Sequence, residues 1–221
     1  MDDPPRLTTW VPDRPPGSKQ AALHRLAAAM RRMNELLMDT DLAEEDLLRE
    51  AEAAEQIGDR IAAGPGRHAL WGYAETANAG DTRANFDQSP LVGRSNAVAP
   101  PLTLRVVEGG VEGTGNFSAA YEGPPGHVHG GIVAAAFDEV LGMVQSMSGK
   151  MGMTGTLTVR YRRPTPLHRD LTFRARVERV EGRKIFTSGT LHDGETLCAE
   201  AEGVFISVDF SRLREMAPSE R

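Results

Sequence analysis

Two glycines, Gly130 and Gly131, follow His129 directly before a long apolar segment that extends to Met147. That segment is too long for a buried strand, so its pattern predicts a helix. The first N–H groups of a helix lack intrahelical partners and lie at the positive end of its dipole. Glycine also allows a ligand to come close to the backbone. This pattern therefore fits either an oxyanion hole or a plain turn that leads into a helix.

Two acidic residues, Asp138 and Glu139, interrupt the same apolar segment. A carboxylate in an apolar helix is costly to bury unless it is paired or used in a reaction. Ala134 and Ala135 lie one turn before Asp138, so the surface around this acid is small and apolar, which suits a general base. The alternative is that one of the two acids simply points to solvent.

His129 and Asp138 are nine residues apart, which corresponds to about 13 Å of helix at 1.5 Å per residue. The two residues cannot both reach one reacting carbonyl group within a single subunit. If both act, the helix start of one subunit must meet the carboxylate of a facing subunit across a two-fold axis. A site that uses both residues therefore requires at least a homodimer.

A helical hairpin is predicted ahead of these residues, over residues 18–64. From Ser18, a candidate N-cap, apolar residues recur with the spacing of an amphipathic helix. Asp41 and Glu44 resemble the capping box of a second helix, which stops at the Gly64-Pro65-Gly66 turn. This hairpin either docks a partner or only covers a face of the main domain.

The rest of the chain divides into a proline-rich flexible arm (1–17), a loop segment (65–100), a main domain (101–210) and a C-terminal tail (211–221). In the main domain, one apolar helix stands among about six segments that predict antiparallel strands. A helix that is apolar on most faces must be wrapped, so we expect an α+β fold with an antiparallel sheet around it. The predicted strands are Leu102–Val107, Val111–Ala119, Thr154–Tyr161, Asp170–Val180, Lys184–Leu191 and Thr196–Val208.

The composition is that of a globular chain: 221 residues, 40% apolar, 25% charged, with a formal net charge of −6. No apolar run approaches the roughly 18 to 20 residues that cross a bilayer, so we expect no integral membrane contact. Acids and prolines occupy the first ten residues where a secretory signal would be basic and then apolar, so we expect a cytoplasmic protein. Cys198 is the single cysteine and the histidines lack metal-ligand spacing, so no disulfide and no metal site are predicted.

Basic residues are concentrated in one part of this acidic chain. The segment from Lys150 to Lys184 contains ten basic and three acidic residues. Alternating arginines such as Arg174 and Arg176 are typical of a solvated strand face. A nucleic-acid partner is not favoured, because the whole chain is acidic and has neither a recognition helix nor a zinc motif.

Several motifs, taken together in order and spacing, resemble the hotdog-fold acyl-CoA thioesterases of the phenylacetate-pathway and THEM4-like group. They are HGG at 129–131, Asp138, Thr154, YRRPTPL at 161–167 and EGRK at 181–184, and the likeness spans residues 100–209. The resemblance implies a hotdog fold and hydrolysis of a fatty (medium or long chain) or aromatic acyl-CoA to free acid and CoA. It further implies a homodimer or homotetramer and no cofactor beyond the coenzyme A of the substrate.

The resemblance also implies a role for each matching residue. The Gly130 N–H would polarise the thioester carbonyl, with His129 shaping the turn and Gly131 allowing close approach. Asp138 of the facing subunit would activate water or attack directly, and Thr154 would orient the attacking group. The phosphates of coenzyme A would lie on four basic residues, namely Arg160, Arg162, Arg183 and Lys184.

Two other functions stay open at this point. A hotdog dehydratase or hydratase needs a histidine beside the catalytic acid, whereas His129 precedes the helix that carries Asp138. A non-catalytic acyl-CoA binding or sensor protein would have the same fold and would bind without turnover. The presence of both Asp138 and Thr154 argues against such a protein.

Overall fold

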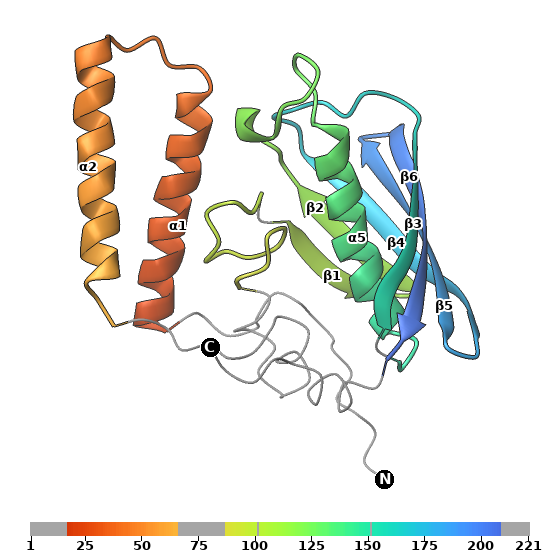
Figure 1. Cartoon of the computed structure of the whole chain (residues 1–221). Coiled ribbons are helices and arrows are strands. Elements are labelled where there is room, and N and C mark those ends of the chain that lie inside the picture. Colours follow the sequence, from red (N-terminus) through yellow and green to blue (C-terminus); the bar gives the residue numbers. More distant parts are fainter. Residues whose placement is uncertain (1–16, 66–86, 101, 151, 209–221) are drawn as a thin grey trace.

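The computed structural model describes residues 17–65, 87–100, 102–150 and 152–208 (Figure 1). The predicted arm apart from Gly17, most of the predicted loop segment and the predicted tail lie outside these residues. The elements are α1 (Ser18–Leu37), α2 (Glu44–Ala62), β1 (Thr103–Val107), β2 (Gly110–Gly115), the 3-10 helix η1 (Ala119–Tyr121), α5 (Gly130–Ser146), β3 (Gly152–Tyr161), β4 (Leu171–Glu181), β5 (Lys184–Asp193) and β6 (Thr196–Ser207).

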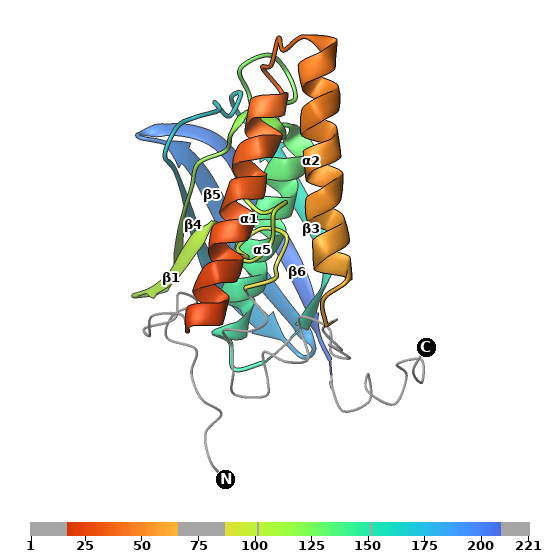
Figure 2. The same cartoon turned by 90° about the vertical axis from the view of Figure 1, so that its left-hand side faces the viewer.

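The six strands form one antiparallel sheet in the order β1-β2-β4-β5-β6-β3. Helix α5 lies along one face of this sheet, and the hairpin of α1 and α2 forms an outer layer on the same side (Figures 1 and 2). The hotdog arrangement and the N-terminal helical hairpin predicted from the sequence are confirmed. Strands β1 and β3 are the two edges of the sheet, and β3 carries mostly exposed residues.

The core is centred on α5, whose side chains at Phe137 and Leu141 are fully buried. Phe137 meets Phe173 of β4 edge to face, with ring centroids 5.5 Å apart. Gly189 and Gly203 let the helix approach the sheet closely, because a Cβ at either position would lie 3.2 Å from the Leu141 side chain. Burying each such side chain contributes about 1.5–3 kcal/mol, so this contact holds the helix in place.

The predicted caps of the hairpin are wrong. Gly17 rather than Ser18 is the N-cap of α1, and Ala43 is the N-cap of α2, so no capping box forms at Asp41. Neither helix has a side-chain cap hydrogen bond. In α2 the acidic first turn, which begins at Glu44, interacts favourably with the positive end of the helix dipole and serves in place of a cap.

The strand predicted over Val111–Ala119 ends earlier, at Gly115. Phe117 leaves the sheet to become fully buried and packs edge to face on Tyr121, with ring centroids 5.8 Å apart. Burial of this aromatic ring therefore overrides the local strand pattern, and η1 then directs the chain toward the start of α5. Among the described residues, no helix is both long and apolar enough to cross a membrane.

Candidate active site

Asp138 of α5 faces the edge strand β3. The Thr154 hydroxyl donates a hydrogen bond of 2.7 Å to Asp138 Oδ1. Both residues are exposed in the single chain, so the apolar surroundings expected from the alanines near Asp138 do not enclose its carboxylate. The chain thus presents a carboxylate whose orientation is set by one neighbour and whose other side is open.

A β-bulge in β3 positions Thr154. In the pairing of β3 with β6, Thr154 lies opposite Phe205 and Thr156 opposite Val204, so Gly155 is the extra residue. A Cβ at position 155 would lie 3.0 Å from the Ile206 side chain, which explains why glycine stands here. Bulges bend a strand and redirect neighbouring side chains. The bulge at Gly155 directly follows Thr154, the residue whose side chain contacts α5.

The start of α5 is organised by His129. The residue is the N-cap of the helix, and its Nδ1 accepts a hydrogen bond of 3.0 Å from the Gly131 N–H. Its backbone carbonyl accepts a bond of 2.9 Å from the Ile132 N–H. The Gly130 N–H, by contrast, meets no acceptor among the described residues. One donor at the positive end of the helix therefore remains available to a ligand.

Tyr161, the last residue of β3, contacts the start of α5, a role that no sequence pattern had assigned to it. Its hydroxyl donates a hydrogen bond of 2.7 Å to the Gly130 carbonyl, and its ring lies 3.5 Å from where a Cβ of Gly130 would be. The two residues are 31 positions apart, so no local spacing could connect them. Tyr161 therefore braces the first turn of α5 from the end of β3.

The two halves of the predicted site lie apart in one chain. Strand β3 runs antiparallel to α5, so Thr154 contacts Asp138 while Tyr161 contacts Gly130. The eight residues from Gly130 to Asp138 correspond to about 12 Å of helix. The free amide and the carboxylate consequently cannot reach one carbonyl group within a single chain.

The predicted phosphate ligands Arg160 and Arg162 lie at the end of β3 where Tyr161 braces the helix. Arg160 forms an ion pair with Glu202 at 2.9 Å, and Arg162 pairs with Glu200. Exposed ion pairs of this kind typically contribute no more than about 1 kcal/mol. Both arginines are therefore partly neutralised but can still exchange their partners for a phosphate.

The predicted ligands Arg183 and Lys184 lie at the turn between β4 and β5, at the opposite end of the sheet from Arg160 and Arg162. Arg183 Nε donates to the Ser207 carbonyl at 3.2 Å, and Lys184 is in register with Ile206 of β6. Ile206 is in turn paired with Met153, next to Thr154. Six residues of β6, or roughly 20 Å at 3.3 Å per residue, separate this end from the Arg160 end. One chain therefore does not bring the four basic residues together.

Glu139, the second acid of the apolar helix, points elsewhere. The hydroxyl of the buried Ser89 donates to Glu139 Oε2 at 3.3 Å. The same hydroxyl oxygen accepts hydrogen bonds from the amides of Leu91 and Val92. Glu139 thus holds the 87–100 segment against α5, whereas Asp138 faces β3, and the two acids have separate surroundings.

A cleft of about 320 Å³ lies between α1 and the segment around η1. None of the predicted site residues lines it, so it is distinct from the surroundings of Asp138. In the described part of the chain, no cluster of three histidine, cysteine or acidic side chains could hold a metal ion. The cleft is lined by Ala28, Arg31, Arg32, Asn34, Glu35, Ala97, Val98, Pro100, Asn116, Ser118, Ala120 and Tyr121.

Comparisons with known proteins point to one family. The family model of the thioesterase superfamily matches residues 125–200. A crystal structure of a thioesterase superfamily protein is 35% identical, with a TM-score of 0.78, covering 88% of this chain and 94% of that one. Acyl-coenzyme A thioesterase THEM4 of Xenopus laevis is 40% identical over 89 residues, 39% of this chain and 40% of that protein. THEM4 of Mus musculus is 37% identical over 90 residues, 40% of this chain and 39% of that protein. The matched part is thus about two fifths of these curated relatives.

Proposed function

Since this chain belongs to the thioesterase superfamily, we propose that it is an acyl-CoA thioesterase that hydrolyses a fatty or aromatic acyl-CoA to the free acid and coenzyme A. The observation that carries the proposal is that α5 presents two different reactive groups at two separate positions. An unoccupied amide lies at its start, and a carboxylate oriented by Thr154 lies eight residues later. These are the two groups that hydrolysis of a thioester requires.

A dimer built on strand β3 would bring these groups together. The strand is an exposed edge, and its free backbone groups can pair with the same strand of a second copy. Its centre lies near Leu157, midway between Thr154 and Tyr161. An antiparallel pairing about that centre turns one copy end for end. The start of α5 in one chain then faces Asp138 of its partner.

The proposed reaction follows from this arrangement. Asp138 of one chain accepts a proton from a water molecule as that water attacks the thioester carbonyl carbon. The Gly130 N–H of the facing chain stabilises the negative charge that develops on the carbonyl oxygen. The carbon–sulfur bond then breaks, the thiolate of coenzyme A takes up a proton and the acid is released. Direct attack by Asp138, through an anhydride that water then hydrolyses, would use the same two groups.

The basic residues support coenzyme A as the carrier group. The same two-fold pairing would place Arg160 and Arg162 of one chain near Arg183 and Lys184 of the other. Arginine and lysine side chains are the usual ligands of phosphates. Exposed Met147 and Met153, near the Asp138 end, leave flexible apolar surface for an acyl group.

The test is release of free thiol from acyl-CoA esters of graded chain length, followed with DTNB. The parent should turn over, and Asp138→Asn should lose at least about 100-fold in kcat while it still binds coenzyme A. Glu139→Gln is the matched control, because its carboxylate faces Ser89, and it should retain turnover. Cys198 should not disturb the assay, since this thiol is 1% exposed and burial raises its pKa.

Two other outcomes of this experiment would change the proposal. Tight acyl-CoA binding without turnover by the parent would indicate a sensor protein rather than an enzyme. Equal turnover by the parent and by Asp138→Asn would show that another group is the base, and a loss of turnover in Glu139→Gln would then identify Glu139 as that group.

A further inference from the structure

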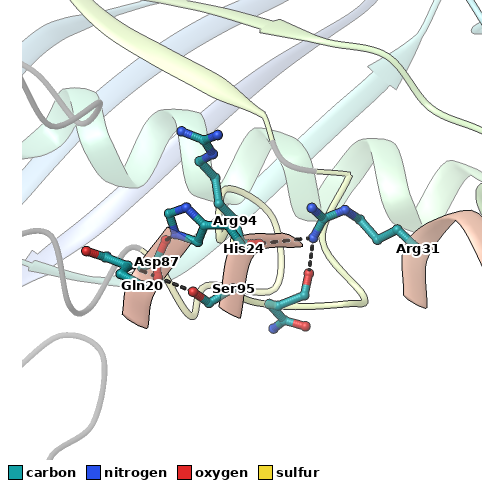
Figure 3. Close-up of polar contacts among 7 residues, drawn as sticks. Gln20, His24, Arg31, Asp87, Arg94 and Ser95 are labelled. Carbon is teal, nitrogen blue, oxygen red and sulfur yellow. Dashed lines mark hydrogen bonds and ion pairs between the residues drawn. The ribbon is translucent and has the colours of Figure 1, made fainter. Parts of the chain in front are cut away.

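Helix α1 is attached by its polar side to the 87–100 segment, as the close-up in Figure 3 shows. His24 Nε2 lies 2.5 Å from Asp87 Oδ1, and Gln20 donates to the same carboxylate. About two turns further along the helix, Arg31 donates to the Asn96 carbonyl at 2.7 Å. An amphipathic helix normally packs by its apolar side. In α1 the buried residue is the small Ala27, and the polar side chains of His24 and Arg31 surround it on the packed side.

The apolar side of α1 is left exposed. At 3.6 residues per turn, its centre lies about 130° around the helix from the side that carries His24 and Arg31. The fractional exposures of its large side chains run from 38% to 61%. They are Leu23, Leu26, Met30, Met33 and Leu37.

Helix α2 continues this exposed apolar surface. None of its residues is buried, and Leu47, Ile57 and Ile61 are 36–55% exposed along one side. Figure 1 shows α2 on the outer side of α1, away from the sheet. Most of the stability of a helix in a protein comes from the packing of its apolar face. The described chain does not supply enough of that packing.

The two helices carry opposite net charges. Within α1 there are four basic residues and one acidic residue, whereas α2 has seven acidic and two basic residues. Two copies related by a two-fold axis can place the basic helix of each against the acidic helix of the other, and the same contact is then made twice. A second copy of this chain therefore complements the hairpin in charge as well as in apolar character.

We propose that the apolar side of the α1–α2 hairpin binds the same side of a second copy, forming a four-helix bundle in which α1 of each chain packs on α2 of the other. Such bundles bury apolar stripes of this length between helices 8–10 Å apart. The contact uses no residue of β3, so it is independent of the pairing proposed for catalysis. It would double whatever assembly the main domain forms.

The first test is sedimentation of the full chain and of Met30→Gln/Ile57→Gln. Glutamine is a good helix former, so the hairpin keeps its helices while its apolar stripe is interrupted. The variant should have half the mass of the parent assembly and retain activity per chain. Leu36→Gln/Leu48→Gln is the matched control, because these residues are exposed on the same helices outside the stripe, and it should assemble like the parent.

The second test concerns the helix pairing. Chains carrying Met30→Cys and Ala54→Cys are mixed and oxidised, and the expected product is a cross-link between unlike chains. Equal masses for the parent and Met30→Gln/Ile57→Gln would overturn the proposal. Cross-links only between like chains would overturn the pairing of α1 with α2. Binding of a parent of unchanged mass to lipid vesicles would assign the stripe to a membrane surface instead.

Discussion

The Thr154 hydroxyl of the edge strand β3 donates to Asp138 Oδ1 of the central helix α5 at 2.7 Å. Seven residues later the same strand supplies Tyr161, which donates to the Gly130 carbonyl at 2.7 Å. Strand β3 thus contacts both Asp138 and Gly130, the two positions of α5 that are proposed to act in the reaction. A small change in this strand should therefore affect the reaction without removing any group from the helix.

Removing the Thr154 hydroxyl should slow the reaction. Thr154→Val keeps the shape of the side chain but leaves Asp138 Oδ1 without its donor. A hydrogen bond to a charged group contributes about 1.5–3 kcal/mol, so we expect kcat to fall by about tenfold or more while KM changes little. Thr154→Ser retains the hydroxyl and should recover most of the loss. Unchanged kcat in the valine variant would show that Asp138 needs no positioning by this residue.

Removing the Gly130 N–H should be still more costly. Proline is well tolerated at the first position of a helix, where its missing N–H breaks no intrahelical hydrogen bond. His129 has φ −59° and ψ 133°, the extended conformation that a residue before proline adopts. We expect Gly130→Pro to lose about 100-fold to 1,000-fold in kcat with unchanged far-UV circular dichroism. Gly130→Ala, which retains the N–H, is the control, and similar losses in both would point to crowding against Tyr161.

Mixed dimers should reveal whether the site is shared. One chain carries Asp138→Asn, the other carries Gly130→Pro, and the two are co-expressed with different tags and purified together. If the helix start and the carboxylate come from different chains, one of the two sites in each mixed dimer is intact. We then expect about half the parent kcat per dimer. Activity no higher than that of either variant alone would place both groups of a site in one chain.

Stability should fall at alkaline pH because of Tyr121. Burial raises the pKa of Tyr121 to about 12, with Arg31 opposing and Glu35 adding to the shift. The unfolded value is about 10, so folding favours the neutral phenol, and its contribution is complete below pH 10. The free energy of unfolding should decrease as the pH rises from about 10 to about 12.

Tyr121→Phe provides the comparison for this prediction. The variant loses the hydrogen bond of 2.8 Å from Tyr121 to the Val98 carbonyl, so it should be less stable than the parent at neutral pH. Its stability should also decline less steeply between pH 10 and 12. Urea unfolding at several pH values measures both effects. Equal slopes for the two proteins would mean that Tyr121 does not titrate on unfolding.

Much of the fold follows from local pattern. The long apolar run that starts at Gly130, the alternation in the strands and the glycine turns at Gly109 and Gly182 all depend on neighbouring residues, and the structure has the predicted helix and sheet. The separation of His129 and Asp138 also depends only on the rise of a helix. For that reason the sequence alone predicts that one chain cannot complete the site.

Other features were decided by contacts between distant parts of the chain. The bulge at Gly155 determines which side chain meets Asp138, and Tyr161 reaches Gly130 from 31 residues away. Ser18 does not cap α1, and that helix presents its polar side to Asp87. Periodicity identifies the two sides of a helix but not what each one meets, because that choice depends on the surfaces that the rest of the chain offers once it has folded.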